Sequence, residues 1–114
     1  EALALSNLRS GHRQHMWRNN CVALGAAAGW VEPLDISNFH FLMSGLSRLT
    51  ALLPTLAMQD SLATLFNREM TEQLACVRDF ALLHYHSAQW RDTPFWNAAR
   101  ESEKPDSLRR RRGR

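Results

Sequence analysis

Residues 17–54 read WRNNCVALGAAAGWVEPLDISNFHFLMSGLSRLTALLP. The short apolar run at residues 21–24 is closed by a glycine, which favours a buried strand, although periodicity alone leaves a helix open. Pro33 then favours extended or turn backbone, because its ring disfavours helical angles in the residue before it. We therefore expect a short strand, a loop over residues 26–36 and then a helix.

That helix is predicted for residues 38–53. Asp35, Ser37 and Asn38 are all residue types that cap helix N-termini, and Pro54 ends the helix because it has no backbone N–H to donate. The apolar residues that follow recur in steps of three and four and so form one stripe of an amphipathic helix: Phe39, Leu42, Met43, Leu46, Leu49 and Leu53.

A second, longer amphipathic helix follows, with Asp60 or Ser61 available as its N-cap. Residues 93–95 predict a short third helix, because proline at the first helical position loses no hydrogen bond. Residues 106–107 could cap one more. The expected fold class is mainly α, with two long amphipathic helices plus a short strand and a loop. The stripe of the second long helix is Leu62, Leu65, Phe66, Met70, Leu74, Val77, Phe80 and Leu83.

The net charge of +3 is concentrated at the end of the chain. Five of the fourteen Lys and Arg lie in residues 109–114, so the preceding residues hold nine cations against eleven acids, a balance of −2. We expect one partial domain over residues 1–104 and a disordered basic tail over residues 105–114. The alternative is a small helical binding module whose arginine tail contacts nucleic acid through its phosphates.

The sequence favours a reducing, cytoplasmic compartment. Its longest apolar stretch, residues 21–31, is shorter than the ~20 residues that a membrane-spanning helix needs. The chain begins with Glu1 and shows no secretory signal. Cys21 and Cys76 lack CxxC spacing and have apolar neighbours, so we expect two buried, reduced thiols. Near the N-terminus, the turn signal at residues 10–11 could join two short strands.

Histidine and tryptophan residues offer weaker candidate sites. His12 and His15 are spaced for one face of a helix, but no third ligand is evident, and we expect no metal site. His84 and His86 are explained by packing near a helix C-terminus. The four tryptophans could stack a flat ligand but favour a core role: Trp17, Trp30, Trp90 and Trp96.

The loop between the predicted strand and the first long helix is the sharper candidate. Its small residues allow a ligand to approach the backbone, and the unpaired N–H groups of the helix start favour an anionic or electron-rich group. Glu32 and Asp35 lie in this loop beside apolar residues. Asp35 could serve as a general base with a raised pKa, and a plain N-cap role for it is about equally favoured.

These residues resemble a known family. Residues 17–25 with residues 32–35 are similar to the WxxNCVALG…EPLEST segment of flavin-dependent tryptophan halogenases. RDFALLHYH at residues 78–86, RDTPFW at 91–96 and PDSL at 105–108 resemble the segments that follow in that family. The resemblance covers residues 11–108, in order, and several independent matches make it specific.

The resemblance implies a piece of a larger enzyme, from the C-terminal half of an α/β flavin-monooxygenase-like fold. Family members carry a GxGxxG motif and a lysine that holds the activated halogen, neither of which is present in this sequence. They use reduced FAD from a separate reductase, O2 and a halide to halogenate tryptophan, indole or another small aromatic. The expected partners are a flavin reductase and such a substrate, without membrane or nucleic acid, and the complete enzyme could form a homodimer.

The resemblance also assigns roles to single residues. Asp35 takes the position of the catalytic glutamate, and Ser37 and Asn38 take the Thr-Gly positions that bind chloride beside the flavin. Ala26 and Phe39 match positions whose backbone contacts FAD. No metal ligand is implied.

Three of these positions depart from the family's pattern. Asp35 is one methylene shorter than glutamate, Ile36 replaces a serine and Asn38 replaces a glycine. We therefore expect weak halogenation even where halide binding is kept, and a relative that oxidises without halogenating, or a decayed copy, remains an alternative. The chain alone is expected to be inactive.

Overall fold

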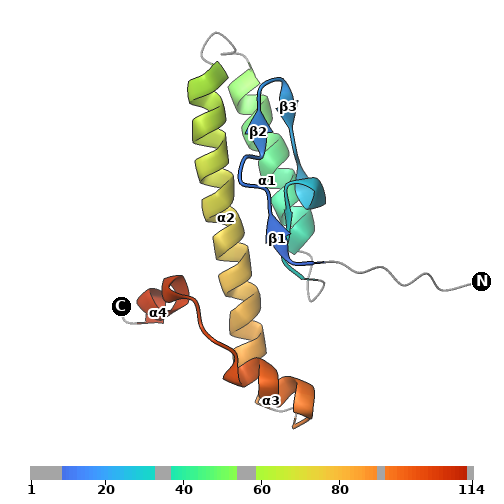
Figure 1. Cartoon of the computed structure of the whole chain (residues 1–114), viewed down its shortest axis with the longest axis vertical. Helices are drawn as coiled ribbons and strands as arrows, with labels where there is room; N and C mark the ends of the chain where they lie inside the picture. Colours follow the sequence, from blue (N-terminus) through green and yellow to red (C-terminus); the bar gives the residue numbers. More distant parts are fainter. Residues whose placement is uncertain (1–8, 33–36, 54–58, 90–91, 113–114) are drawn as a thin grey trace, which may run out of the picture. The chain divides into compact units, whose positions relative to one another are not determined.

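The structure is a computed structural model of the chain (Figure 1). It divides into two compact units, residues 1–74 and 75–114, and the boundary falls inside the longest helix. This division differs from the expected one at residue 104. In the part of the chain that the structure describes, no helix is long and apolar enough to cross a membrane. That part comprises residues 9–32, 37–53, 59–89 and 92–112. At residues 37 and 110–112 it covers the backbone but not the side chains.

The described residues of the first unit include four strands of two residues each. Strand β1 (Gly11–His12) pairs antiparallel with β4 (Gly29–Trp30), and β2 (Trp17–Arg18) pairs antiparallel with β3 (Cys21–Val22). The expected hairpin at residues 10–11 is therefore wrong. The tight turn instead lies between β2 and β3, where Asn19 has a φ of 52°, a left-handed angle that asparagine tolerates better than most residues.

The predicted strand at residues 21–24 is also shorter and less buried than expected. Only Cys21 and Val22 are in β3, and neither side chain is buried. Both cysteines are exposed, which corrects the expectation of buried thiols. The reason is local: Cys21 follows directly on the hairpin turn, and Cys76 lies on an exposed part of its helix.

Both long helices form where the sequence predicts them. Helix α1 covers Ser37–Leu52 and helix α2 covers Gln59–Ser87. In the first unit they are joined by an ion pair between Arg48 and Glu69, whose side chains are both about one-third exposed. The first unit also contains a short 3-10 helix, η1 (Gly25–Ala27), next to α1 in Figure 1.

The buried face of α1 differs from the predicted stripe. Phe41 is 1% exposed, whereas Phe39, at the start of that stripe, is 64% exposed. A Cβ added at Gly45 would lie 3.1 Å from Met70 Cε and 3.1 Å from Leu24 Cδ2, so the missing side chain lets α2 approach α1 on that face. The helix therefore has a second apolar face that stays exposed, formed by Phe39, Met43 and Leu46.

The core of the first unit lies between the strands and the two long helices. The rings of Trp17 and Phe66 meet edge to face with centroids 5.7 Å apart. Such pairs add about 0.5–1.5 kcal/mol beyond the burial of their area. This confirms a core role for Trp17; Trp90 lies outside the described residues. The most buried members of the cluster are Met16, Trp17, Ala28, Phe41, Phe66, Met70 and Leu74.

The second unit contains the end of α2 and two shorter helices. Helix α3 covers Pro94–Glu101, with Thr93 as its N-cap, as the sequence predicts. Aromatic contacts hold it against α2, and the ring centroids of Tyr85 and Trp96 are 5.7 Å apart. It is also held by a hydrogen bond of 2.7 Å from Arg100 Nη1 to the carbonyl oxygen of Ala88.

Helix α4 covers Asp106–Arg112, most of the range where we expect a disordered tail. It begins at the residues that the sequence offers as a further cap. Ser107 Oγ donates to Asp79 Oδ1 at 3.1 Å, and Arg78 Nη2 donates to Ser107 Oγ at 2.9 Å. Asp79 is 2% exposed, so this network fixes the first turn of α4 to a buried carboxylate on α2.

Candidate functional site

The candidate loop starts with a compact turn of small residues. Gly25 has a φ of 55°, in the left-handed region that favours glycine, and its carbonyl accepts a hydrogen bond of 3.0 Å from the Ala28 N–H. Ala28 is 1% exposed, while the side chains of Ala26 and Ala27 are exposed. The buried Ala28 therefore anchors the turn in the core, while Ala26 and Ala27 face outward.

The turn lies directly against the start of α1. A Cβ added at Gly25 would be 3.1 Å from Leu42 Cδ1, so the two backbones approach closely here. Leu42 is one helical turn after Asn38. The turn at Gly25 is thus packed against the second turn of α1.

The start of α1 is tied to the other end of the loop. Asn38 Nδ2 donates to the carbonyl oxygen of Glu32 at 3.1 Å. This hydrogen bond spans residues 33–36, which lie outside the described residues and include Asp35. A glycine at position 38 could not make this contact.

The predicted site residues thus divide into three groups. Ala26 lies on η1, and Asn38 and Phe39 lie in the first turn of α1. Asn38 is part-buried, and Ala26 and Phe39 are exposed. Ser37 is the first residue of α1, and only its backbone is described. Asp35, the predicted catalytic carboxylate, falls outside the described residues.

The arrangement offers hydrogen-bond donors to an anionic or electron-rich group. The first N–H groups of a helix have no acceptor within the helix, and their dipoles point outward along its axis. The start of α1 provides such groups, and η1 packs against the same helix at Leu42. Small side chains on η1 leave its backbone approachable.

Arg13 also holds the turn, and the sequence reasoning missed it. Its backbone N–H donates to the carbonyl oxygen of Ala28 at 2.8 Å, and its Nε donates to that of Ala27 at 2.7 Å. Because its partners are backbone oxygens, no pattern of side-chain types indicates the contact. Arg13 and Arg18 also line a surface hollow of about 800 Å³ that reaches Ala27.

Asn67 is a second residue that the sequence reasoning missed. Its Oδ1 accepts hydrogen bonds from the backbone N–H groups of Met16 and Trp17, at 2.8 and 2.7 Å. Its Nδ2 donates to the carbonyl oxygen of Trp17 at 2.9 Å. The only signal in the sequence was a polar residue directly after Phe66, which belongs to the apolar stripe of the long helix.

The histidines do not form a metal site. His12 and His15 are both exposed, and the described residues contain no group of three His, Cys, Asp or Glu side chains that could hold a metal ion. His86 is part-buried, with its Nδ1 2.9 Å from the carbonyl oxygen of Arg100, in line with the packing role expected for it.

The model of the tryptophan halogenase family matches residues 2–113 of the chain. The chain belongs to the tryptophan halogenase family. This confirms the resemblance that the motifs indicate, and the matched range contains the turn η1, the start of α1 and all four helices.

Relatives of this tryptophan halogenase family chain include enzymes and solved structures. Tryptophan 6-halogenase ThaL of Streptomyces albogriseolus is 36% identical over 101 residues, 89% of this chain and 19% of ThaL. BrvH, a flavin-dependent halogenase from Brevundimonas sp. BAL3, matches with a TM-score of 0.80 at 36% identity, over 90% of this chain and 21% of BrvH. Xcc4156, a flavin-dependent halogenase from Xanthomonas campestris, matches with a TM-score of 0.79 at 39% identity, over 97% and 23%. The chain spans about a fifth of the length of these relatives.

Proposed function

We propose that the chain supplies the flavin- and halide-facing segment of a flavin-dependent halogenase-like monooxygenase. The substrate class is a small aromatic compound such as tryptophan or indole, and the reductant comes from a separate flavin reductase. The observation that carries the proposal is the close approach of the turn η1 to the start of α1, within a chain whose relatives are flavin-dependent halogenases. The chain by itself does not complete the reaction.

The described residues fit a flavin. The exposed alanines of η1 leave room for a flat ring system at the backbone, and Phe39 is 64% exposed beside them. We assign backbone contacts with the flavin to Ala26 and Phe39. FAD in its reduced form supplies, when bound, the electrons that a monooxygenase needs to activate O2.

A halide fits the start of α1. Backbone N–H groups at a helix N-terminus bind anions because they lack helical acceptors and point the same way. We assign this role to residues 37 and 38. The carboxylate of Asp35 precedes them and would orient the halogenating species toward the aromatic substrate.

The departures from the family's pattern lower the expected rate. An aspartate at position 35 withdraws the carboxylate by one methylene, and a misplacement of about 1 Å costs on the order of a hundredfold in rate. The hydrogen bond from Asn38 to Glu32 has the opposite effect, because it joins the two ends of the segment that carries Asp35. We propose that Asn38 helps to position this carboxylate.

A hybrid enzyme tests the proposal. The 101 residues of ThaL that align with this chain are replaced by the chain's own sequence, and halogenated tryptophan is measured with reduced FAD and chloride. We expect slow turnover that Asp35→Asn abolishes. Glu32→Gln is the matched control, because it neutralises the other carboxylate of the loop, and it should leave most of the turnover in place.

Two results would count against the proposal. An equal loss of turnover in Asp35→Asn and Glu32→Gln would show that Asp35 has no special role. A hybrid that is folded by circular dichroism and binds tryptophan, yet gives no product even with Asp35→Glu and Ile36→Ser together, would contradict the assignment of this segment to halogenation.

A further inference from the structure

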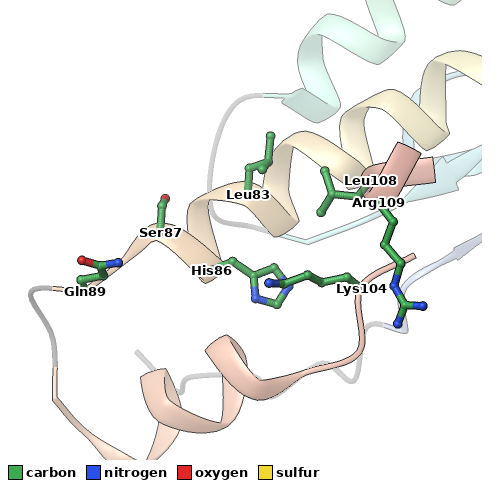
Figure 2. Close-up of a pocket in the computed structure, with 7 residues that line it drawn as sticks. All are labelled: Leu83, His86, Ser87, Gln89, Lys104, Leu108 and Arg109. Atoms are coloured by element: carbon green, nitrogen blue, oxygen red, sulfur yellow. The ribbon is translucent and has the colours of Figure 1, made fainter. Parts of the chain in front are cut away.

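The second unit contains a cavity that is separate from the candidate flavin and halide residues. Its volume is about 550 Å³. It lies between the end of α2, which contributes Leu83 and His86, and the segment around α4, which contributes Lys104, Leu108 and Arg109 (Figure 2). All of these residues belong to the second compact unit.

His86 presents an unused hydrogen-bonding atom at this cavity. Its Nδ1 is 2.9 Å from the carbonyl oxygen of Arg100. Because a carbonyl oxygen can only accept, Nδ1 carries a proton and acts as the donor. The other nitrogen, Nε2, is buried and has no hydrogen-bond partner among the described residues. Buried polar atoms usually have a partner, so Nε2 marks a polar part of the cavity wall whose hydrogen-bonding capacity is open.

Two cations border the same cavity. Figure 2 shows the Lys104 side chain extended toward the His86 ring, with Arg109 on the α4 side. Arg109 Nη1 is 3.9 Å from Asp106 Oδ1, and both side chains are more than half exposed, so this pair holds Arg109 only weakly. The structure gives Lys104 no ion pair within the described part of the chain.

Two leucines, Leu83 and Leu108, form the apolar part of the wall, and Ser87 and Gln89 complete the lining. Leu108 is 4% exposed and lines the cavity together with Leu83. The hydrogen bonds among Arg78, Asp79 and Ser107 hold the first turn of α4, which carries Leu108. The cavity is therefore formed before any ligand binds.

We propose that this cavity binds a small organic acid. The carboxylate pairs with Lys104 and Arg109, and the apolar body packs against Leu83 and Leu108. His86 lies at the polar end of the cavity, where its ring can report on a bound anion. The proposal is independent of the assignment of the flavin and halide residues.

Three probes separate the parts of this proposal, and all are titrated into the whole 114-residue chain by calorimetry. Hexanoate has both a carboxylate and an apolar chain. Hexan-1-ol keeps the apolar chain without the charge, and acetate keeps the carboxylate without the chain. We expect hexanoate to bind at least about tenfold more tightly than either, because charge-assisted hydrogen bonds and apolar burial each contribute about that factor. Equal affinity for hexanoate and hexan-1-ol would overturn the proposal.

Variants then locate the site. Lys104→Met and Arg109→Met together should weaken hexanoate binding about tenfold or more. Arg68→Met is the matched control, since it removes an exposed cation from the first unit, and it should leave the affinity unchanged. The imidazole signals of His86 in NMR spectra should shift on addition of hexanoate. An unchanged affinity in the double variant, or shifts confined to histidines of the first unit, would overturn the proposal.

Discussion

The side-chain amide of Asn67 forms two hydrogen bonds with the backbone of Trp17, which lies 50 residues earlier in the chain. Oδ1 accepts from the Trp17 N–H at 2.7 Å, and Nδ2 donates to the Trp17 carbonyl at 2.9 Å. A third bond, from the Met16 N–H to Oδ1, completes the contact. One side chain of α2 thus fixes the position of the β2–β3 hairpin, which precedes the candidate loop.

Replacing Asn67 should therefore destabilise the first unit. Asn67→Ala leaves three backbone groups of a part-buried segment without partners, and we expect the free energy of unfolding to fall by about 2–3 kcal/mol. Asn67→Asp keeps the acceptor but loses the donor, so its effect should be smaller. Urea unfolding followed by circular dichroism measures both. A loss below about 0.5 kcal/mol in Asn67→Ala would show that solvent replaces these bonds.

Two glycines should respond differently to the same substitution. At Gly29 an added Cβ would lie 2.7 Å from Leu74 Cδ2 and 2.9 Å from His12 Cβ, so we expect Gly29→Ala to cost about 1–3 kcal/mol. At Gly45 the nearest atoms are 3.1 Å away, at the ends of flexible side chains, and alanine favours a helix. Gly45→Ala should thus be close to neutral. Thermal unfolding measures the stability of both variants. A larger loss of stability in Gly45→Ala than in Gly29→Ala would contradict the close packing around Gly29 in β4.

The contact between α4 and α2 depends on Ser107. Ser107→Ala removes the donor to Asp79 and should lower the stability of α4 by about 0.5–1.5 kcal/mol. Hydrogen exchange measured by NMR should then be about tenfold faster for the amides of residues 108–112. Ser102→Ala is the control, because the Ser102 hydroxyl donates to the carbonyl oxygen of Ala99 at the end of α3 and not to α4. Equal exchange in the two variants would mean that other contacts hold α4.

The exposed apolar face of α1 should be detectable with a dye that binds apolar surface. Met43 and Leu46 are 47% and 42% exposed. Met43→Glu with Leu46→Glu should reduce the fluorescence of 8-anilinonaphthalene-1-sulfonate by at least about half, since neighbouring exposed apolar residues form a patch. Ser47→Glu with Thr50→Glu adds the same charge to the same helix at exposed polar positions, and should have little effect. If both pairs quench equally, charge rather than apolar surface explains the signal.

Asn38 offers a test of the loop itself. In the hybrid with ThaL, Asn38→Gly removes the hydrogen bond to Glu32 and restores the family's residue at that position. If Asn38 positions the segment that carries Asp35, turnover should fall several-fold while the Michaelis constant for chloride stays the same. An increase in turnover would instead mean that a glycine is required beside the halide.

Long helices could be predicted from the sequence, whereas the direction of their faces could not. The caps and proline residues set the ends of α1 to within a residue or two of Ser37–Leu52. The stripe that begins at Phe39 was right for Leu49, which packs against the core, and wrong for Phe39, Met43 and Leu46, which stay exposed. The helix carries apolar residues on two faces, and Phe41, outside the stripe, is the buried one.

The strands and the contacts of the loop were harder to predict for a related reason. Each strand has two residues, too few for any alternation to appear. Their positions are set by the side chains of Arg13 and Asn67, which bond to backbone atoms far away in the sequence. Such contacts depend on tertiary structure, so residue type alone does not indicate them. The motifs, by contrast, pointed to the tryptophan halogenase family, and the family match confirms this.

The central claim is our proposal that Ala26 and Phe39 contribute to the flavin-facing surface of a halogenase-like enzyme. The most direct test is the dissociation constant of FAD for the hybrid with ThaL, compared with that of ThaL itself, measured by quenching of flavin fluorescence. The account predicts a value within about tenfold of the parent enzyme, a difference of no more than about 1.4 kcal/mol. A hybrid that is folded and binds tryptophan but shows no saturable binding of FAD would contradict it.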